Sequence, residues 1–298
     1  MENHSIIEKL GFKASDKVVI FHIDDMGVSH SINEASFECL DFGVASCGSV
    51  ISPSSWLFEA ASICKNNPKY DIGVHLTLTC EYDLYRWRAL STIDSSTGLL
   101  DSEGCLWRTS EEAIKNVTPK AAEIEMKAQV QRAIDNGIDV THIDTHMGTV
   151  MDPKFLPAYL KIAREFQIPA FLPRVDKKSL IDMGMGDIAD VILKMFLKIE
   201  ASGFPIIDHM IIDTMDNYAD KVPYYCNLMA ELKPGLTHFL FHPGKLSSEL
   251  KAIAPDSAEW RDQDYRSFTD SRIKDCVEKY DLKIIGYRKI REYFRNQQ

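Results

Sequence analysis

The chain has 298 residues, of which 45% are hydrophobic and 26% are charged, and this ordinary composition excludes collagen-like sequence, coiled coils and long disordered stretches. Its 44 acidic side chains outnumber the 34 basic ones and give a formal net charge of −10. No basic run interrupts this balance, so we expect no nucleic-acid partner.

The amino-terminal residues lack the basic start, apolar middle and small-residue cleavage site of an export signal. No apolar run reaches the ~18 residues that cross a bilayer, so we expect no membrane partner. The 7 cysteines include no C-x-x-C pair, and their odd number argues against a complete set of disulfides. We therefore expect a cytoplasmic protein with reduced cysteines, each packed as a small core residue. The sequence leaves a homodimer open.

Short apolar runs rich in β-branched and aromatic residues predict strands, and segments with helical spacing lie between them. In chain order, the predicted strands are 17–23, 45–51, 72–78, 140–144, 169–175, 210–213, 238–242 and 283–286. The predicted helices are 32–41, 56–66, 111–136, 155–165, 188–200, 218–232 and 271–279. This alternation indicates repeated βα units and therefore an α/β fold.

Repeated βα units form either an open doubly wound sheet or a closed (β/α) barrel. The number of units fits the barrel better, and no glycine-rich nucleotide-binding loop follows a predicted strand. No linker or low-complexity tract divides the chain. We predict one domain over residues 1–298, folded as a single TIM-barrel-like (β/α) barrel, regular or distorted, with seven to eight βα units.

The connection at 80–110 is too long for an ordinary loop and is rich in aromatic and arginine side chains. Long loops after barrel strands commonly build substrate sites, and Arg86 beside Trp87 suits the flat faces and hydroxyls of a sugar. The alternative is a mini-core that packs the loop against the barrel rim. The sequence leaves both interpretations open.

Four predicted strands end in side chains that bind metals or move protons. These side chains are Asp24 and Asp25, then His75, then His142, Asp144 and His146, and finally His242. Because the carboxyl ends of barrel strands face one opening, we expect the clusters to converge there. Two histidines and a carboxylate suit zinc, iron, manganese or cobalt. Taken singly, each cluster also has a structural explanation, as a helix cap, a second-layer network or a hydrogen-bonded core histidine.

Five motifs follow one another along most of the chain: HIDDMGVSHSINEA, GVHLTLT, THIDTH, LPRVD and FHPG. With this ordered set, and with WRDQDYRSF near its end, the sequence resembles the YdjC-like carbohydrate deacetylase family, which includes the chitooligosaccharide deacetylases. The resemblance implies a barrel-like hydrolase that removes the N-acetyl group from an acetylated amino sugar, its small-molecule partner. It also implies one divalent cation, magnesium or zinc foremost and manganese, cobalt or nickel as alternatives.

The resemblance also implies roles for individual residues. It makes Asp25, His75 and His146 the metal ligands, Asp24 the base, His242 the proton donor and Arg174 a charged residue of the pocket. We further expect His142 and Asp144 to orient the ligands from a second layer.

The chain departs from the family pattern at Met26, where phenylalanine is common, and at Met147 and Gly148, where further histidines are common. Two other functions stay open. One is a metal-dependent sugar-phosphate isomerase or aldolase, and the other is a barrel that binds metal or sugar without turnover.

Overall fold

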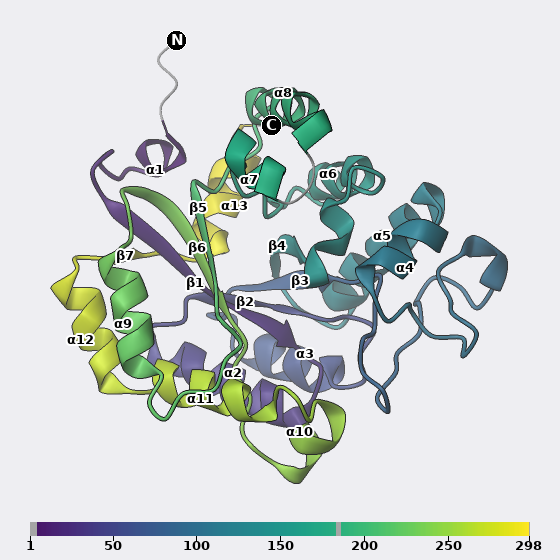
Figure 1. The fold of residues 1–298 in the computed structure, drawn as a ribbon, viewed down its shortest axis with the longest axis horizontal. Coiled ribbons are helices and arrows are strands. Elements are labelled where there is room, and N and C mark those ends of the chain that lie inside the picture. Colours follow the sequence, from purple (N-terminus) through teal and green to yellow (C-terminus); the bar gives the residue numbers. More distant parts are fainter. Residues whose placement is uncertain (1–4, 183–185, 298) are drawn as a thin grey trace.

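A computed structural model describes residues 5–182 and 186–297. Its sheet has 7 strands that all pair in parallel, in the order β4-β3-β2-β1-β6-β5, with β7 placed beside β1 (Figure 1). The strands are β1 (Lys17–Met26), β2 (Cys47–Val50), β3 (Ile72–Leu76), β4 (Val140–Thr145), β5 (His209–Ile212), β6 (Gly235–Phe241) and β7 (Lys283–Ile284).

Isolated bridges close this sheet into a distorted barrel. Ile143 of β4 bridges Ala170, and Pro173 bridges Ile207, which lies just before β5. The predicted strand at 169–175 therefore completes the ring without forming a regular strand. The reason is that Pro169 and Pro173 in this segment have no N–H group to donate to a continuous ladder. The α/β fold predicted from the sequence is confirmed.

The helices lie around the outside of the sheet (Figure 1). They are α1 (Ile6–Lys9), α2 (His30–Phe42), α3 (Leu57–Asn66), α4 (Ser110–Asn116), α5 (Pro119–Asp135), α6 (Leu156–Glu165), α7 (Lys177–Asp182), α8 (Ala189–Ala201), α9 (Val222–Ala230), α10 (Ser248–Ile253), α11 (Ala258–Phe268), α12 (Ser271–Lys279) and α13 (Tyr287–Arg295). Helix α12 has the predicted bounds. The predicted helix at 111–136 is divided, because Thr118 caps a new helix whose first residue is Pro119.

The end of β1 brings two adjacent carboxylates to one place. Asp25 has a φ of 64°, in the left-handed region that non-glycine residues seldom occupy. The pairing of β1 with β2 is irregular between Ile23 and Met26 as a result. Side chains in a regular strand alternate between faces, so this break lets Asp24 and Asp25 both approach the same histidine.

The loop at 80–110 packs on itself. Trp87 is buried, and its indole Nε1 donates to the carbonyl oxygen of Thr79 at 3.0 Å. Arg86 forms an ion pair with Asp101 at 2.7 Å. Both residues therefore hold the loop together, as the mini-core interpretation expects.

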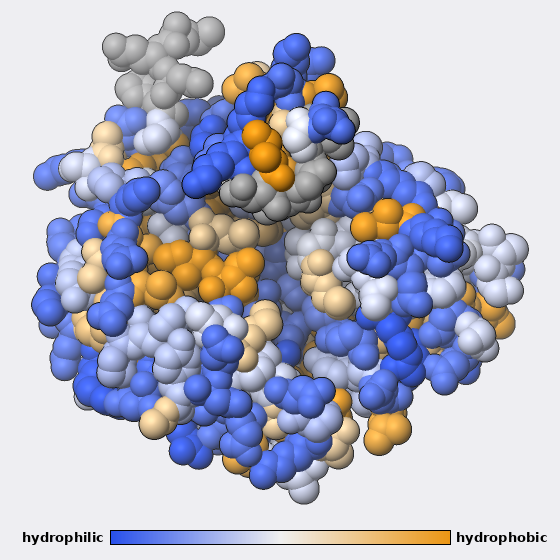
Figure 2. Space-filling model, in the orientation of Figure 1, coloured by the Kyte–Doolittle hydropathy of each residue, from blue (hydrophilic) through white to orange (hydrophobic). Residues whose placement is uncertain are grey.

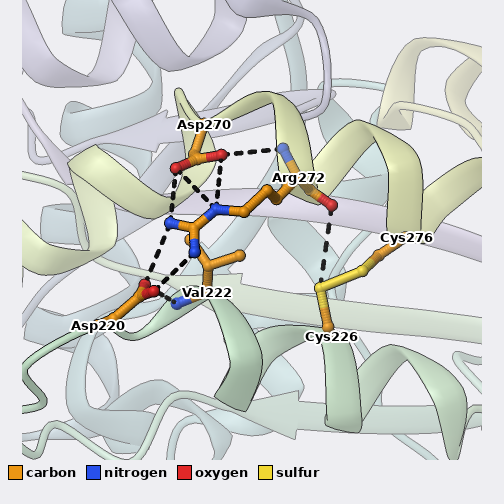
Figure 3. Close-up of a disulfide and its surroundings, with 6 residues drawn as sticks. All are labelled: Asp220, Val222, Cys226, Asp270, Arg272 and Cys276. Atoms are coloured by element: carbon orange, nitrogen blue, oxygen red, sulfur yellow. Dashed lines mark hydrogen bonds and ion pairs between the residues drawn. A yellow bond between two sulfur atoms is a disulfide. The ribbon is translucent and has the colours of Figure 1, made fainter.

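The prediction that all cysteines are reduced is wrong for two of them. Cys226 of α9 and Cys276 of α12 form a disulfide that joins the two helices (Figure 3). Arg272 of α12 reinforces the same contact through an ion pair with Asp220 at 2.6 Å. The other five cysteines are free and buried. No helix in the described part of the chain is both long enough and apolar enough to span a membrane.

Candidate metal centre

Three side chains from the carboxyl ends of β1, β3 and β4 meet at one point. Asp25 ends β1, His75 lies in β3, and His146 begins the short 3-10 helix η2 (His146–Met151) after β4. The Oδ1 atom of Asp25 is 3.5 Å from His75 Nε2 and 3.2 Å from His146 Nδ1. Figure 2 shows a hydrophilic hollow in the middle of the face where the β1 arrow ends in Figure 1.

The donor set of this cluster fits a divalent cation. The three candidate ligand atoms lie within 4.8 Å of one another, and all three residues are buried. The Oδ1 atom of Asp25 has no hydrogen-bond partner. A buried carboxylate oxygen without a hydrogen bond is costly unless a positive charge lies beside it. A bound cation would supply that charge, and neutral imidazole nitrogens are suitable companion ligands.

Asp144 lies behind His75 and orients its ring. The Nδ1 atom of His75 is 3.0 Å from Asp144 Oδ1, and the other carboxylate oxygen accepts a hydrogen bond from Ser49 at 2.7 Å. With its proton on Nδ1, His75 directs the lone pair of Nε2 toward Asp25. This carboxylate–histidine arrangement is the usual support of a metal ligand.

Charges around the ligands are balanced by protons and by one arginine. Burial would raise the pKa of Asp25, but Arg261 and His146 hold this pKa well below its ordinary value. Burial would lower the pKa of His146, but Glu81 and Asp25 raise it well above its ordinary value. A cation that binds here would replace the proton on the imidazole.

Asp24 and His242 lie beside the three candidate ligands. The Oδ2 atom of Asp24 is 3.8 Å from His75 Nε2 and 3.9 Å from His242 Nε2. Burial lowers the pKa of His242, and its Nδ1 atom has no hydrogen-bond partner. His242 is therefore neutral in the resting protein near pH 7.

A chain of hydrogen bonds runs from Asp24 into the barrel. His22 Nδ1 is 2.7 Å from Asp24 Oδ1, and His22 Nε2 is 2.8 Å from His142 Nε2. His142 Nδ1 is 3.0 Å from the hydroxyl of Thr141. With both imidazoles neutral, all three contacts are hydrogen bonds if Thr141 donates to His142, His142 to His22, and His22 to Asp24. His142 thus reaches Asp24 through His22 and contacts none of the three candidate ligands.

The strand-end pattern did not identify several residues of the site. Arg261 of α11 donates to Asp25 Oδ2 at 2.7 Å, and its Nη1 atom has no partner. Glu81 of the 80–110 loop lies 3.0 Å from His146 Nε2. Two signals were available: Arg261 lies in the WRDQDYRSF motif, and Glu81 follows the GVHLTLT motif closely.

A second buried ionic group supports the end of β6. Asp264 accepts hydrogen bonds from the backbone N–H of His242 at 3.0 Å and from Lys221 Nζ at 2.7 Å. Lys221 also pairs with Asp213 at 2.8 Å. Burial, and then repulsion from Asp213, raise the pKa of Asp264 to about 7. This group joins α9, α11 and the strand end that carries His242.

Three residues predicted to bind substrate have protein partners in the structure. The side chain of Arg174 is 46% exposed and forms ion pairs with Glu200 at 2.8 Å and with Asp208 at 3.6 Å. Arg86 and Trp87 serve the internal packing of their loop. The structure brings none of the three into contact with the candidate ligands.

The fold and the site define an α/β barrel whose strand ends gather histidine and carboxylate side chains. Residues 18–279 match the family of YdjC-like proteins, and the chain belongs to that family. The resemblance seen in the sequence is confirmed.

Two relatives cover nearly the whole chain. A carbohydrate deacetylase from Thermus thermophilus is 28% identical over 96% of this chain and 98% of its own length. A carbohydrate deacetylase from Thermoanaerobacter pseudethanolicus is 21% identical over 91% of this chain and 98% of its own. A crystal structure from Enterococcus faecalis, of a protein with a proposed role in cellobiose-phosphate cleavage, has a TM-score of 0.75 at 20% identity and covers 93% of this chain and 99% of that one. This last similarity supports the fold.

Proposed function

We propose that the protein is a metal-dependent carbohydrate N-deacetylase. It would hydrolyse the N-acetyl group of an acetylated amino sugar or short oligosaccharide and release acetate. The observation that carries the proposal is the buried group of Asp25, His75 and His146, with ligand atoms within 4.8 Å of one another and one carboxylate oxygen without a partner. The two relatives named carbohydrate deacetylases support the reaction class.

Asp25, His75 and His146 would hold the cation. One carboxylate and two imidazoles form a mixed set that accepts zinc, magnesium, manganese, cobalt or nickel. When bound, such a cation polarises a carbonyl oxygen and lowers the pKa of water from about 15.7 to about 7.

Asp24 would accept the proton of the attacking water. Its Oδ1 atom is held by His22 at 2.7 Å, so Oδ2 is the oxygen that faces His75 and His242. The fixed contact keeps the carboxylate in one orientation, and this orientation is what a general base needs.

His242 would deliver the proton to the leaving nitrogen. Its Nε2 atom is 3.9 Å from Asp24 Oδ2, close enough to receive the proton that Asp24 takes from water. Because burial lowers the pKa of His242, its protonated form is a stronger acid than free imidazolium and gives up the proton readily. Water adds to the acetyl carbon, the C–N bond breaks, and the proton ends on the amine.

Two further groups fit an oxygen-rich substrate. The Nη1 atom of Arg261 and the hydroxyl of Tyr82 are both buried without a hydrogen-bond partner. Buried donors that lack partners are costly, and the hydroxyl and carbonyl oxygens of an acetylated sugar would satisfy them. The cytoplasmic location and the homodimer remain predictions.

The test is acetate release from diacetylchitobiose by the purified protein. Asp25→Ala and His146→Ala should lose bound metal and activity together, whereas His242→Ala should keep the metal and lose turnover. Full activity of His146→Ala would refute the ligand assignment. If sugars are retained and no acetate appears from any N-acetylated sugar, the proposed chemistry is wrong.

A further inference from the structure

The loop at 80–110 contacts a candidate metal ligand directly. The Oε2 atom of Glu81 is 3.0 Å from His146 Nε2, and the Nδ1 atom on the other side of the ring is 3.2 Å from Asp25 Oδ1. A neutral imidazole has one N–H group. If Nε2 donates that hydrogen to Glu81, the lone pair of Nδ1 points toward Asp25 and toward the cation that Asp25 would share.

The far end of the loop holds the same turn. The hydroxyl of Ser110 contacts the carbonyl oxygen of Met147 at 3.2 Å and the hydroxyl of Thr149 at 2.7 Å. Met147 and Gly148 follow His146 with φ values of 53° and 71°. A left-handed conformation at a non-glycine residue persists only where the surroundings fix it. The turn that carries His146 is therefore fixed from both ends of the loop.

The loop is stiff enough to transmit its position to Glu81. The backbone N–H of Cys80, next to Glu81, donates to the carbonyl oxygen of Trp107 at 2.6 Å, which joins the start of the loop to its end. Arg86 links the first part of the loop to Asp101 in its second half through an ion pair at 2.7 Å. Glu81 itself lies in the loop and is partly exposed, with 31% of its side chain accessible.

We propose that Glu81 is a positioning residue for metal binding, and that the loop at 80–110 sets the affinity of the centre through it. The inference rests on the proposed metal site and deepens it. The two histidine ligands would then be oriented from different places. Asp144 holds His75 from inside the barrel, whereas Glu81 holds His146 from the loop that covers the rim. Loss of such a second-layer carboxylate typically weakens metal binding by about 10- to 100-fold.

The experiment measures the Kd of Zn²⁺ for the full-length apo-protein by competition with a chromophoric chelator. Glu81→Ala should weaken binding by about 10- to 100-fold. Glu81→Gln keeps an oxygen that accepts the Nε2 hydrogen, so it should restore part of the loss. Glu103→Gln is the matched control, because the Glu103 carboxylate is on the same loop but pairs with Arg86 and Arg108. This control should bind zinc as the wild type does.

The outcomes separate the inference from the proposed function. Zinc affinity of Glu81→Ala within about twofold of the wild type would overturn the inference, and so would an equal loss in Glu103→Gln, since general loosening of the loop would then explain both. If Glu81→Ala does not fold, the test uses Glu81→Gln. The role of the Glu81 charge would be overturned if Glu81→Gln bound zinc with wild-type affinity and its cobalt-substituted form had the wild-type absorption spectrum. Equal binding by the wild type and His146→Ala would instead refute the metal centre itself, and the inference with it.

Discussion

Replacement of Asp264 by asparagine should remove a pH dependence of stability that the wild-type protein shows. Asp264 is fully buried between α9, α11 and the end of β6, where it pairs with Lys221 at 2.7 Å. Burial, and then the neighbouring carboxylate of Asp213, raise its pKa from 3.8 to about 7. Asparagine has nearly the same shape and does not titrate.

The magnitude follows from the size of the pKa shift. An increase of about 3 pH units at 1.36 kcal/mol per unit corresponds to about 4 kcal/mol. Because the pKa is higher in the folded state, the folded protein holds one more proton than the unfolded chain between about pH 4 and pH 7. The contribution of Asp264 to stability is therefore greatest below about pH 4, falls by about 1.4 kcal/mol per pH unit across that window, and is constant above it.

The assay is urea unfolding of the wild type and of Asp264→Asn at several pH values between about 4.5 and 8, with a chelator present so that metal binding does not contribute. The difference in unfolding free energy between the two proteins should change with pH as described. Asp256→Asn, at an exposed position, serves as the control and should follow the wild type. Parallel curves for the wild type and Asp264→Asn, or a difference of the opposite sign, would refute the reasoning.

Three further predictions concern other parts of the molecule. Reduction of the Cys226–Cys276 disulfide, or Cys226→Ser, should lower the unfolding free energy by about 4 kcal/mol, because the bond closes a loop with a sequence separation of 50; an unchanged urea midpoint in reductant would contradict this. Gly73→Ala should lower Tm, since a Cβ there would lie 2.5 Å from the ring of His142, at a cost of about 1–3 kcal/mol; a wild-type melting curve would contradict it. Burial lowers the pKa of His75, but Asp144 raises it to about 8, so zinc affinity should fall as the pH drops below about 8. Calorimetry should detect proton release when zinc binds, and equal zinc affinities at about pH 6 and pH 8 would contradict this prediction.

The sequence predicted those parts of the molecule that local patterns determine. Apolar runs located seven of the strands, and the rule that parallel strands end at one opening predicted that Asp25, His75 and His146 approach one another. The segment at 169–175 has the composition of a strand, but its prolines limit it to single bridges. The division of the helix at 111–136 was readable from the Thr-Pro pair that starts α5.

The contacts of the remaining site residues join parts of the chain that are far apart in sequence. Arg261 pairs with Asp25 across 236 positions of sequence, and Glu81 reaches His146 across 65. Cys226 and Cys276 likewise lie on two separate helices that only the folded chain brings together. Local periodicity identifies which residues end a strand, but it does not say which helix or loop will cover them.

The barrel interior beneath the site contains buried polar side chains that contact one another. Barrels are usually filled with branched apolar side chains, yet the layer beneath Asp24 contains His22, His142 and His238, and Tyr287 stacks on His142 at 3.9 Å between ring centroids. His238 Nδ1 is 3.0 Å from the Tyr287 hydroxyl, so its ring also has a polar partner. An apolar residue in place of His22 would leave Asp24 Oδ1 without its 2.7 Å contact, and the carboxylate could then rotate. The polar interior thus fixes the orientation of the Asp24 carboxylate at the mouth of the barrel.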